Sequence, residues 1–259
     1  MLADDKGVPK EEVKSWSGYP GGAPCNVACG CAQLDIPVTF VSCLGKDKMG
    51  DELTELMQGA VLPAPQSPIP LRRQCVSTHR SEGGVEATGA LLHTQTAHGA
   101  LLAAWCAGRG VDVSAVRRVE QPTRDVYVVR TATGDRIFDS FGQDTTTYCD
   151  CFIDADHLPV DKICAAKVLV LGTLGLAYPV TAEAMRAAVA VAKAAQTVVL
   201  VDVNWRPVFF EDPDGATKTV MDFAKGADVV KITDEEAEWG LGIPAADALA
   251  EPAKVCSPL

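Results

Sequence analysis

The sequence predicts an α/β fold with a mainly parallel central sheet, helices on both faces of that sheet and a small antiparallel hairpin. From residue 167 to residue 239, short apolar runs alternate with helix-compatible segments, and this alternation is typical of parallel sheets. Residues 125–141 indicate two alternating strands around a Gly-Asp turn, which is a hairpin pattern. With 259 residues, the chain is long enough for one sizeable domain.

The charge of the chain excludes two classes of partner. The net charge is −11, and a strongly negative surface repels nucleic acid and anionic membranes. A nucleotide substrate stays open, because a glycine-rich loop, a helix N-terminus and Mg²⁺ together hold phosphates on an acidic protein. The longest apolar region, residues 187–203, is interrupted by Lys193, Gln196 and Asp202, so we expect no transmembrane helix.

The ten cysteines point to a reducing, intracellular compartment rather than to disulfides. No secretory signal peptide opens the sequence, and the chain is long and rich in apolar residues. No cysteine pair has C-x-x-C spacing, and the four histidines show no metal-ligand spacing. We therefore expect the cysteines to be small buried residues.

The stretch GGAPCNVA, residues 21–28, is the first candidate site. Gly21 and Gly22 allow a sharp turn and the close approach of a ligand, and Pro24 suits the opening of a helix. Asn26 offers a donor and an acceptor, which suits a sugar hydroxyl. A glycine-rich turn that merely caps an ordinary helix would use the same residues.

The elements that follow extend this motif. We expect the helix to run to Leu34 and to end before Pro37, followed by a strand at 38–44, a turn at 45–50 and a helix at 51–58. The whole run, GGAPCNVACGCAQLDIPVTFVSCLGKDKMGDEL, closely resembles the N-terminal signature of the PfkB (ribokinase-like) carbohydrate kinases, particularly fructokinase-like members from plants and cyanobacteria.

This resemblance implies a ribokinase-like three-layer α/β/α sandwich with a mainly parallel central sheet and a small β lid, here with an incomplete C-terminal part. It also implies a sugar, with fructose favoured, and ATP as substrates, with Mg²⁺ as the metal ion. It leaves open a homodimer formed through the lid, and it leaves open whether the compartment is the cytoplasm or the plastid.

The chain departs from the family pattern at its start. In the family, a first core strand carrying a sugar-holding aspartate precedes the segment that resembles residues 2–9. We therefore expect residues 1–259 to be a single partial domain.

Residues 59–105 are a second departure. They are rich in Pro, Ser, Thr and Gly and show weak periodicity, and a compact domain rarely contains so long an irregular loop. We expect an irregular insertion that packs poorly, either a retained intron in a gene model or a real regulatory or partner-binding loop.

The second half of the chain carries three expected strands, at 167–171, 197–203 and 228–232. Helices are expected at 181–195, with Thr181 as the cap, at 216–224, and from 233 onward. Ligands bind at the carboxyl ends of strands in open parallel sheets. Both remaining motifs lie at these ends.

The first of these motifs, Asp202-Val-Asn-Trp-Arg206, resembles the family's D-x-N-x-R segment. The resemblance implies that Asp202 and Asn204 bond sugar or water, and that Arg206 holds a phosphate through its fork of donors. A polar strand-to-loop junction with an Arg–Asp pair would use the same residues.

The second motif runs from Thr233 to Glu236 and resembles the family's N-x-x-E motif, with Thr233 in place of the asparagine. The resemblance implies that Glu236 organises Mg²⁺ and phosphate, generally through water. Helix capping is the alternative, because threonine caps helices and acids favour the first turn.

No Gly-Ala-Gly-Asp segment lies in residues 1–259. In the family, that segment supplies the aspartate base and the anion-binding amides, so we assign no catalytic residue and expect these residues to be weak or inactive as a kinase. Two alternatives stay open: a catalytically dead fructokinase-like protein that acts as a binding subunit, for example in a plastid transcription complex, or a gene-model fragment.

Overall fold

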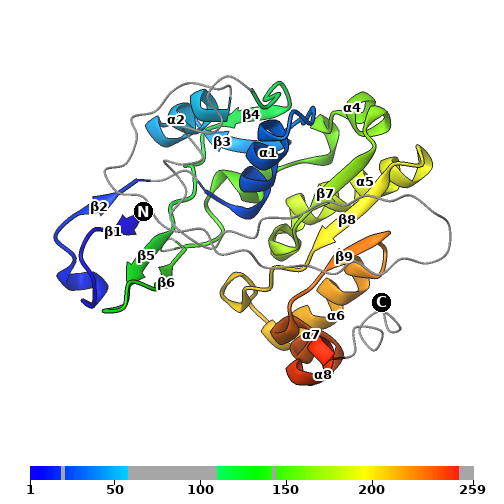
Figure 1. Ribbon diagram of the computed structural model, residues 1–259. Coiled ribbons are helices and arrows are strands. Elements are labelled where there is room, and N and C mark those ends of the chain that lie inside the picture. Colours follow the sequence, from blue (N-terminus) through cyan, green and yellow to red (C-terminus); the bar gives the residue numbers. More distant parts are fainter. Residues whose placement is uncertain (19–20, 58–109, 142–143, 251–259) are drawn as a thin grey trace.

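A computed structural model describes residues 1–18, 21–57, 110–141 and 144–250 (Figure 1). The expected insertion at 59–105 lies outside these residues. The strands described fall into three sheets. A four-stranded sheet, which we call the lid sheet, has the order β2-β1-β5-β6 and comprises β1 (Leu2–Ala3), β2 (Trp16–Ser17), β5 (Tyr127–Arg130) and β6 (Arg136–Ser140).

The other strands are all parallel to their neighbours. One sheet pairs β3 (Ser42–Gly45) with β4 (Val116–Val119). The other, which we call the core sheet, has the order β7-β8-β9 and comprises β7 (Val168–Leu171), β8 (Val198–Asp202) and β9 (Val229–Lys231). The expected parallel arrangement is therefore present, although no strand pairing joins the two parallel sheets within the described residues.

Helices connect these strands. The α-helices are α1 (Ala23–Gln33), α2 (Lys48–Met57), α4 (Val160–Ala165), α5 (Pro179–Ala194), α6 (Pro213–Ala224), α7 (Asp234–Leu241) and α8 (Ala245–Ala250). Short 3₁₀ turns are η1 (Lys10–Glu12), η2 (Cys149–Phe152), η3 (Ala155–His157), η4 (Leu174–Ala177) and η5 (Pro207–Phe209). No helix in the described ranges is both long and apolar enough to cross a membrane.

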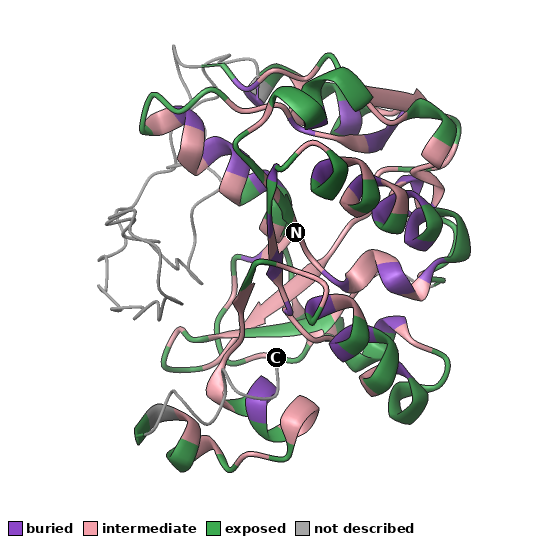
Figure 2. Cartoon of the chain, turned by 90° about the vertical axis from the view of Figure 1, so that its right-hand side faces the viewer, coloured by how far each residue is buried: buried purple, intermediate pink, exposed green. Residues whose placement is uncertain are grey.

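The main hydrophobic core lies on one face of the core sheet. Val199 and Val201 of β8, and Val203 just after it, are fully buried against small residues of α5 and α6 such as Ala192 and Ala224. Figure 2 shows buried and exposed positions alternating along the helices. Small alanines let the helices approach the sheet closely, and burying the three valines stabilises the fold by about 1.5–3 kcal/mol for each side chain.

The opposite face of the core sheet differs from the expectation of two covered faces. Val168, Val170, Val198 and Val229 are all at least 39% exposed. They belong to one face because side chains alternate along a strand and paired residues lie side by side. Parallel sheets usually bury both faces, so within the described residues this sheet is covered on one side only.

Two helices begin earlier than the sequence suggests, because aspartates cap them. Asp47 accepts a hydrogen bond from the backbone amide of Gly50 at 2.7 Å, so α2 begins before the expected residue 51. Asp212 accepts one from the amide of Gly215 at 3.0 Å, so α6 begins before residue 216.

The prediction that Thr181 caps α5 is wrong. The helix begins at Pro179, with Tyr178 at the cap position. The hydroxyl of Thr181 instead donates to the carbonyl of Asp150 at 2.9 Å. The expected strand at 38–44 is also shorter, beginning at Ser42 and preceded by a single bridge from Thr39 to Asp112.

The cysteines of the described residues form no disulfide. Cys25, Cys29, Cys43, Cys149 and Cys151 are buried, as expected for small core residues, whereas Cys164 is exposed.

Candidate functional site

The glycine-rich turn forms the start of α1, as predicted. Gly22 is the N-cap with φ +96°, a conformation that favours glycine, and Pro24 lies in the first turn. A Cβ built on Gly21 or Gly22 would meet no atom of another described residue within 4 Å. Asn26 is exposed. The helix start is therefore open to a ligand, and in the view of Figure 1 it lies between the lid sheet and the core sheet.

The D-x-N-x-R segment lies at the carboxyl end of β8. Asp202 is the last residue of the strand and pairs in register with Lys231 of β9. The ammonium of Lys231 lies 2.9 Å from Oδ1 of Asp202, without the alignment of a hydrogen bond, so this contact is an ion pair. The expected alternative of an Arg–Asp pair is therefore replaced by a Lys–Asp pair between adjacent strands.

The chain turns sharply after this strand. Asn204 has φ +41°, a left-handed conformation that asparagine tolerates better than most residues. Arg206 follows, and its Nη1 donates to the carbonyl of Trp205 at 2.6 Å. Its guanidinium carbon lies 5.9 Å from the ring centre of Phe138, on β6 of the lid sheet. Arg206 therefore lies where the lid sheet meets the end of the core sheet.

Glu236 joins the two motifs. The side chain is 7% exposed and forms the capping box of α7: Oε2 accepts from the amide of Thr233 at 2.9 Å, while the Thr233 hydroxyl accepts from the amide of Glu236 at 3.2 Å. Its Oε1 accepts from the amide of Trp205 at 2.8 Å. One carboxylate thus ties the start of α7 to the loop after β8.

The hydrogen bonds of Glu236 limit the ways in which these residues could hold Mg²⁺. No group of three or more His, Cys, Asp or Glu side chains within the described ranges is arranged to hold a metal ion. Each oxygen of Glu236 already accepts one amide hydrogen, which leaves further lone pairs for water. The residues present therefore fit a hydrated Mg²⁺ held through water better than one bound directly by several carboxylates.

An aromatic cleft beneath the lid sheet was not predicted. It has a volume of about 810 Å³, and none of the predicted site residues lines it. Trp16 and Tyr127 meet edge to face with ring centres 5.0 Å apart. Asp125 accepts a hydrogen bond from the Tyr148 hydroxyl at 2.9 Å. Burial, followed by this hydrogen bonding to Asp125, raises the pKa of Tyr148.

The signal for this cleft was present in the sequence. Asp125 and Tyr127 are two residues apart in an alternating segment, so they share a face of the strand region. What the sequence did not reveal is that Trp16 and Tyr148, far away along the chain, lie against that face.

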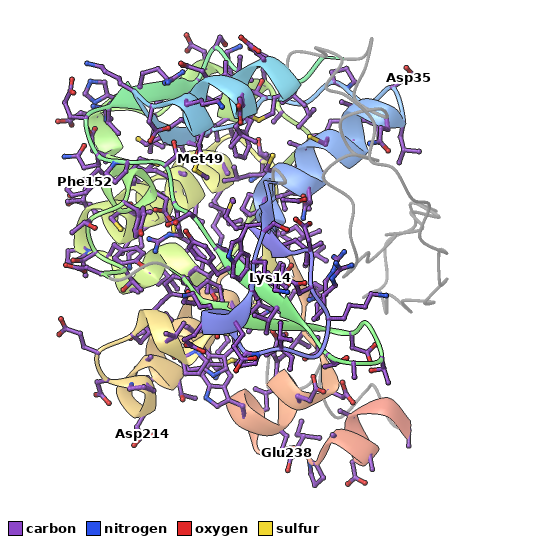
Figure 3. The ribbon with its side chains drawn as sticks, turned by 90° about the vertical axis from the view of Figure 1, so that its left-hand side faces the viewer. Lys14, Asp35, Met49, Phe152, Asp214 and Glu238 are labelled. Atoms are coloured by element: carbon purple, nitrogen blue, oxygen red, sulfur yellow. The ribbon has the colours of Figure 1, made fainter. Side chains whose placement is uncertain are left out.

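The structure brings together only part of the predicted site. Asp202, Asn204, Arg206 and Glu236 gather at the carboxyl ends of β8 and β9. No hydrogen bond or ion pair within the described part of the chain links Asn26 to them. In Figure 3, Glu238 of α7 and Asp214 of α6 mark one end of the molecule, opposite Met49 of α2.

Phe138 and Phe141 pack against other aromatic rings. Their rings stack with centres 5.8 Å apart, and Phe141 meets Phe209 of η5 at 4.8 Å. These contacts join β6 to the segment that follows Arg206.

Comparisons with known proteins agree with this architecture. Among solved structures, a PfkB protein from Polaromonas sp. JS666 has a TM-score of 0.66 at 22% identity, covering 93% of this chain and 64% of its own. A fructokinase from Xylella fastidiosa has a TM-score of 0.66 at 21% identity, covering 98% of this chain and 66% of its own. The fold is therefore ribokinase-like, as the sequence motifs implied.

Curated relatives show the same kinship. A 5-dehydro-2-deoxygluconokinase of Shouchella clausii is 25% identical over 228 residues, covering 88% of this chain and 55% of its own length. Fructokinase-2 of Oryza sativa is 25% identical over 238 residues, covering 91% and 55% respectively. The chain thus spans about half the length of these relatives.

The family profile "pfkB family carbohydrate kinase" matches residues 2–69 and 85–256, which is most of the sequence. With the parallel core sheet, the lid sheet and the motif-bearing strand ends in place, the chain belongs to the pfkB family of carbohydrate kinases.

Proposed function

We propose that the complete protein is an ATP-dependent sugar kinase that transfers the γ-phosphoryl group to a hydroxyl of fructose, with Mg²⁺. The observation that carries the proposal is the bond from the Trp205 amide to Glu236, which joins the D-x-N-x-R and Thr233–Glu236 motifs at the carboxyl ends of adjacent parallel strands. Ligands bind at such strand ends in open parallel sheets. The similarity to plant fructokinases favours fructose over other sugars.

Each predicted residue takes a role in this proposal. Gly21, Gly22 and Asn26 offer the sugar an open helix start. Asp202 and Asn204 bond sugar hydroxyls or water. Arg206 holds a phosphate through guanidinium donors other than the one bonded to Trp205, and Glu236 orders water around Mg²⁺.

The aromatic cleft supports a sugar-facing role for the lid sheet. A sugar presents apolar C–H faces and polar hydroxyls, which match the rings of Trp16 and Tyr127 and the carboxylate of Asp125. Because the net charge is −11, we propose no role for nucleic acid or an anionic membrane. The compartment proposed is the cytoplasm or the plastid.

A homodimer through the lid sheet is part of the proposal. β6 is an edge strand, and its Ile137 and Phe138 are 52% and 51% exposed. Unpaired edges with apolar side chains favour pairing with another strand. Light scattering of the full-length protein should give a dimer that Ile137→Lys dissociates.

The test of the function is a phosphorylation assay with the full-length protein, ATP, Mg²⁺ and a panel of fructose, ribose and adenosine. Fructose should give the highest kcat/KM, and Arg206→Met should lower kcat/KM about a hundredfold by removing a charged phosphate contact. No turnover of any sugar would contradict the proposal. A separate assay of residues 1–259 alone should give weak or no turnover, because they hold no Gly-Ala-Gly-Asp segment.

A further inference from the structure

Arg124 is the most heavily hydrogen-bonded cation in the described part of the chain, and none of the motifs includes it. Its side chain is 11% exposed. Nε and Nη2 bond the two carboxylate oxygens of Asp150 at 2.8 and 3.0 Å, which is a bidentate pair. Burial acts to lower its pKa, but the hydrogen bonds and charge interaction with Asp150, together with Tyr178 and Cys151, raise the pKa overall, so the guanidinium stays charged.

Arg124 lies at a point where the chain passes into the lid sheet. It lies between Thr123, which is bonded to the end of β3 and the start of α2, and β5, which belongs to the lid sheet. The Thr123 hydroxyl accepts from the amide of Gly45 at 3.0 Å, and the Thr123 amide donates to Asp47 at 2.7 Å. Residues 123–125 are therefore the outgoing crossing from the core to the lid sheet.

Arg124 also forms hydrogen bonds with the segment through which the chain leaves the lid sheet after β6. After β6, the chain leaves the lid sheet through Phe141 and passes Thr145 before it reaches η2. Nη1 of Arg124 donates to the carbonyl of Phe141 at 3.2 Å, and Nη2 donates to the carbonyl of Thr145 at 2.8 Å. One guanidinium thus binds two of the chain crossings between the lid sheet and the rest of the molecule, the one into β5 and the one out of β6.

The same side chain reaches the core elements beyond the crossings. Nη2 donates to the hydroxyl of Tyr178, at the start of α5, at 3.2 Å. The guanidinium carbon lies 5.1 Å from the ring centre of Phe209. Phe209 packs on Phe141 at 4.8 Å. Arg124 is therefore in contact with the end of the lid sheet, the start of α5 and the segment that follows Arg206.

We propose that Arg124 is a positioning residue that fixes the lid sheet relative to the core and thereby sets the affinity of the protein for its sugar. The positioning rests on the contacts above, and the effect on sugar affinity rests also on the proposed function. Lysine does not supply this fork, because all its donors lie on one nitrogen, whereas three different nitrogens of Arg124 bond Asp150, Phe141 and Thr145.

The test compares Arg124→Met and Arg124→Lys with a matched control, Arg117→Met, in the full-length protein. Arg117 forms an ion pair with Asp154 at 2.5 Å and lies on β4, and in the described part of the chain it forms no hydrogen bond or ion pair with residues 123–125, Phe141 or Thr145. Hydrogen exchange of residues 126–141 and of the core sheet, and the Kd for fructose, are measured for each. The midpoint of thermal unfolding is measured alongside.

Both Arg124 variants should speed exchange in residues 126–141 by about tenfold, with β7–β9 unchanged. They should raise the Kd for fructose by about tenfold, as expected for the loss of a buried charged hydrogen-bond network. Arg117→Met should lower the unfolding midpoint and leave both the lid exchange and the Kd unchanged. If Arg124→Met does not fold, Asp150→Asn removes the charge of its partner and is measured in the same way.

Three outcomes test the positioning role, the proposed function and the link between them separately. Unchanged lid exchange in a folded Arg124 variant overturns the positioning role, whatever sugar binds. If the wild type binds no fructose, the proposed function fails, while faster lid exchange in the Arg124 variants still supports the positioning role. Faster lid exchange with an unchanged Kd would overturn the link from position to sugar affinity.

Discussion

The backbone amide of Trp205 donates a hydrogen bond to Oε1 of Glu236 at 2.8 Å. Trp205 belongs to the loop after β8, and Glu236 to the first turn of α7, so the bond joins the ends of two neighbouring strands. The ring of Trp205 also stacks on Trp239 of α7, with centres 3.9 Å apart. The buried glutamate therefore has a structural role that the helix-capping interpretation alone does not include.

This role predicts that Glu236→Gln lowers the free energy of unfolding by about 1–3 kcal/mol, because the glutamine NH₂ would face one of the two amide donors. The changed stacking of Trp205 should alter tryptophan fluorescence. Urea unfolding followed by fluorescence measures both. The control is the exposed neighbour Glu235→Gln, which should change neither. Equal stability of the two variants would contradict the prediction.

Substitutions at Gly21 and Gly22 test separately whether a glycine is needed for the backbone conformation or for the close approach of a ligand. Gly21→Ala should leave thermal stability unchanged, because its new Cβ meets no part of the described structure within 4 Å. Gly22→Ala should lower stability by about 1 kcal/mol or more, because φ is +96° there. Calorimetry measures these effects. If Gly21→Ala also keeps full sugar affinity, the close approach of a sugar to Gly21 is ruled out.

A substitution at Asn26 tests sugar contact without an expected change in the stability of the fold. Its side chain is exposed and forms no hydrogen bond with any described residue. Asn26→Ala in the full-length protein should therefore keep the unfolding midpoint. It should lose about 1–3 kcal/mol of transition-state stabilisation if the amide bonds a hydroxyl, measured as kcat/KM for fructose. Glu52→Ala, an exposed substitution on α2, is the control, and an equal loss in both variants would refute the assignment.

The raised pKa of the Cys149 thiol predicts a loss of stability at alkaline pH. Burial raises the pKa of this thiol to about 12, from an ordinary value of 9.0. The unfolded state loses the proton first, so the stabilisation is complete below pH 9 and falls as the pH rises toward 12. Between pH 8 and 10.5, the wild type should lose about 1–2 kcal/mol more stability than Cys149→Ala, measured by urea unfolding. Cys164→Ala, at an exposed thiol, should behave like the wild type.

The sequence by itself determined the local elements and the family. Glycines 21 and 22 before Pro24 predicted the start of α1, and the Gly-Asp turn at 134–135 predicted the β5–β6 hairpin, because these signals act through backbone conformation within a few residues. The Thr233-to-Glu236 spacing offered helix capping as an alternative to the metal role, and the structure shows that capping box.

Tertiary structure alone decided which distant residues meet. The bond from Trp205 to Glu236, the pair of Asp202 with Lys231 and the cleft between Trp16 and Tyr148 all join segments far apart in the chain. Periodicity reports which face a residue occupies, not what lies against that face. Arg124 shows this most clearly: nothing in its neighbours along the sequence indicates that Asp150, Phe141 and Thr145 converge on it, because that convergence depends on how the lid sheet and the core pack together.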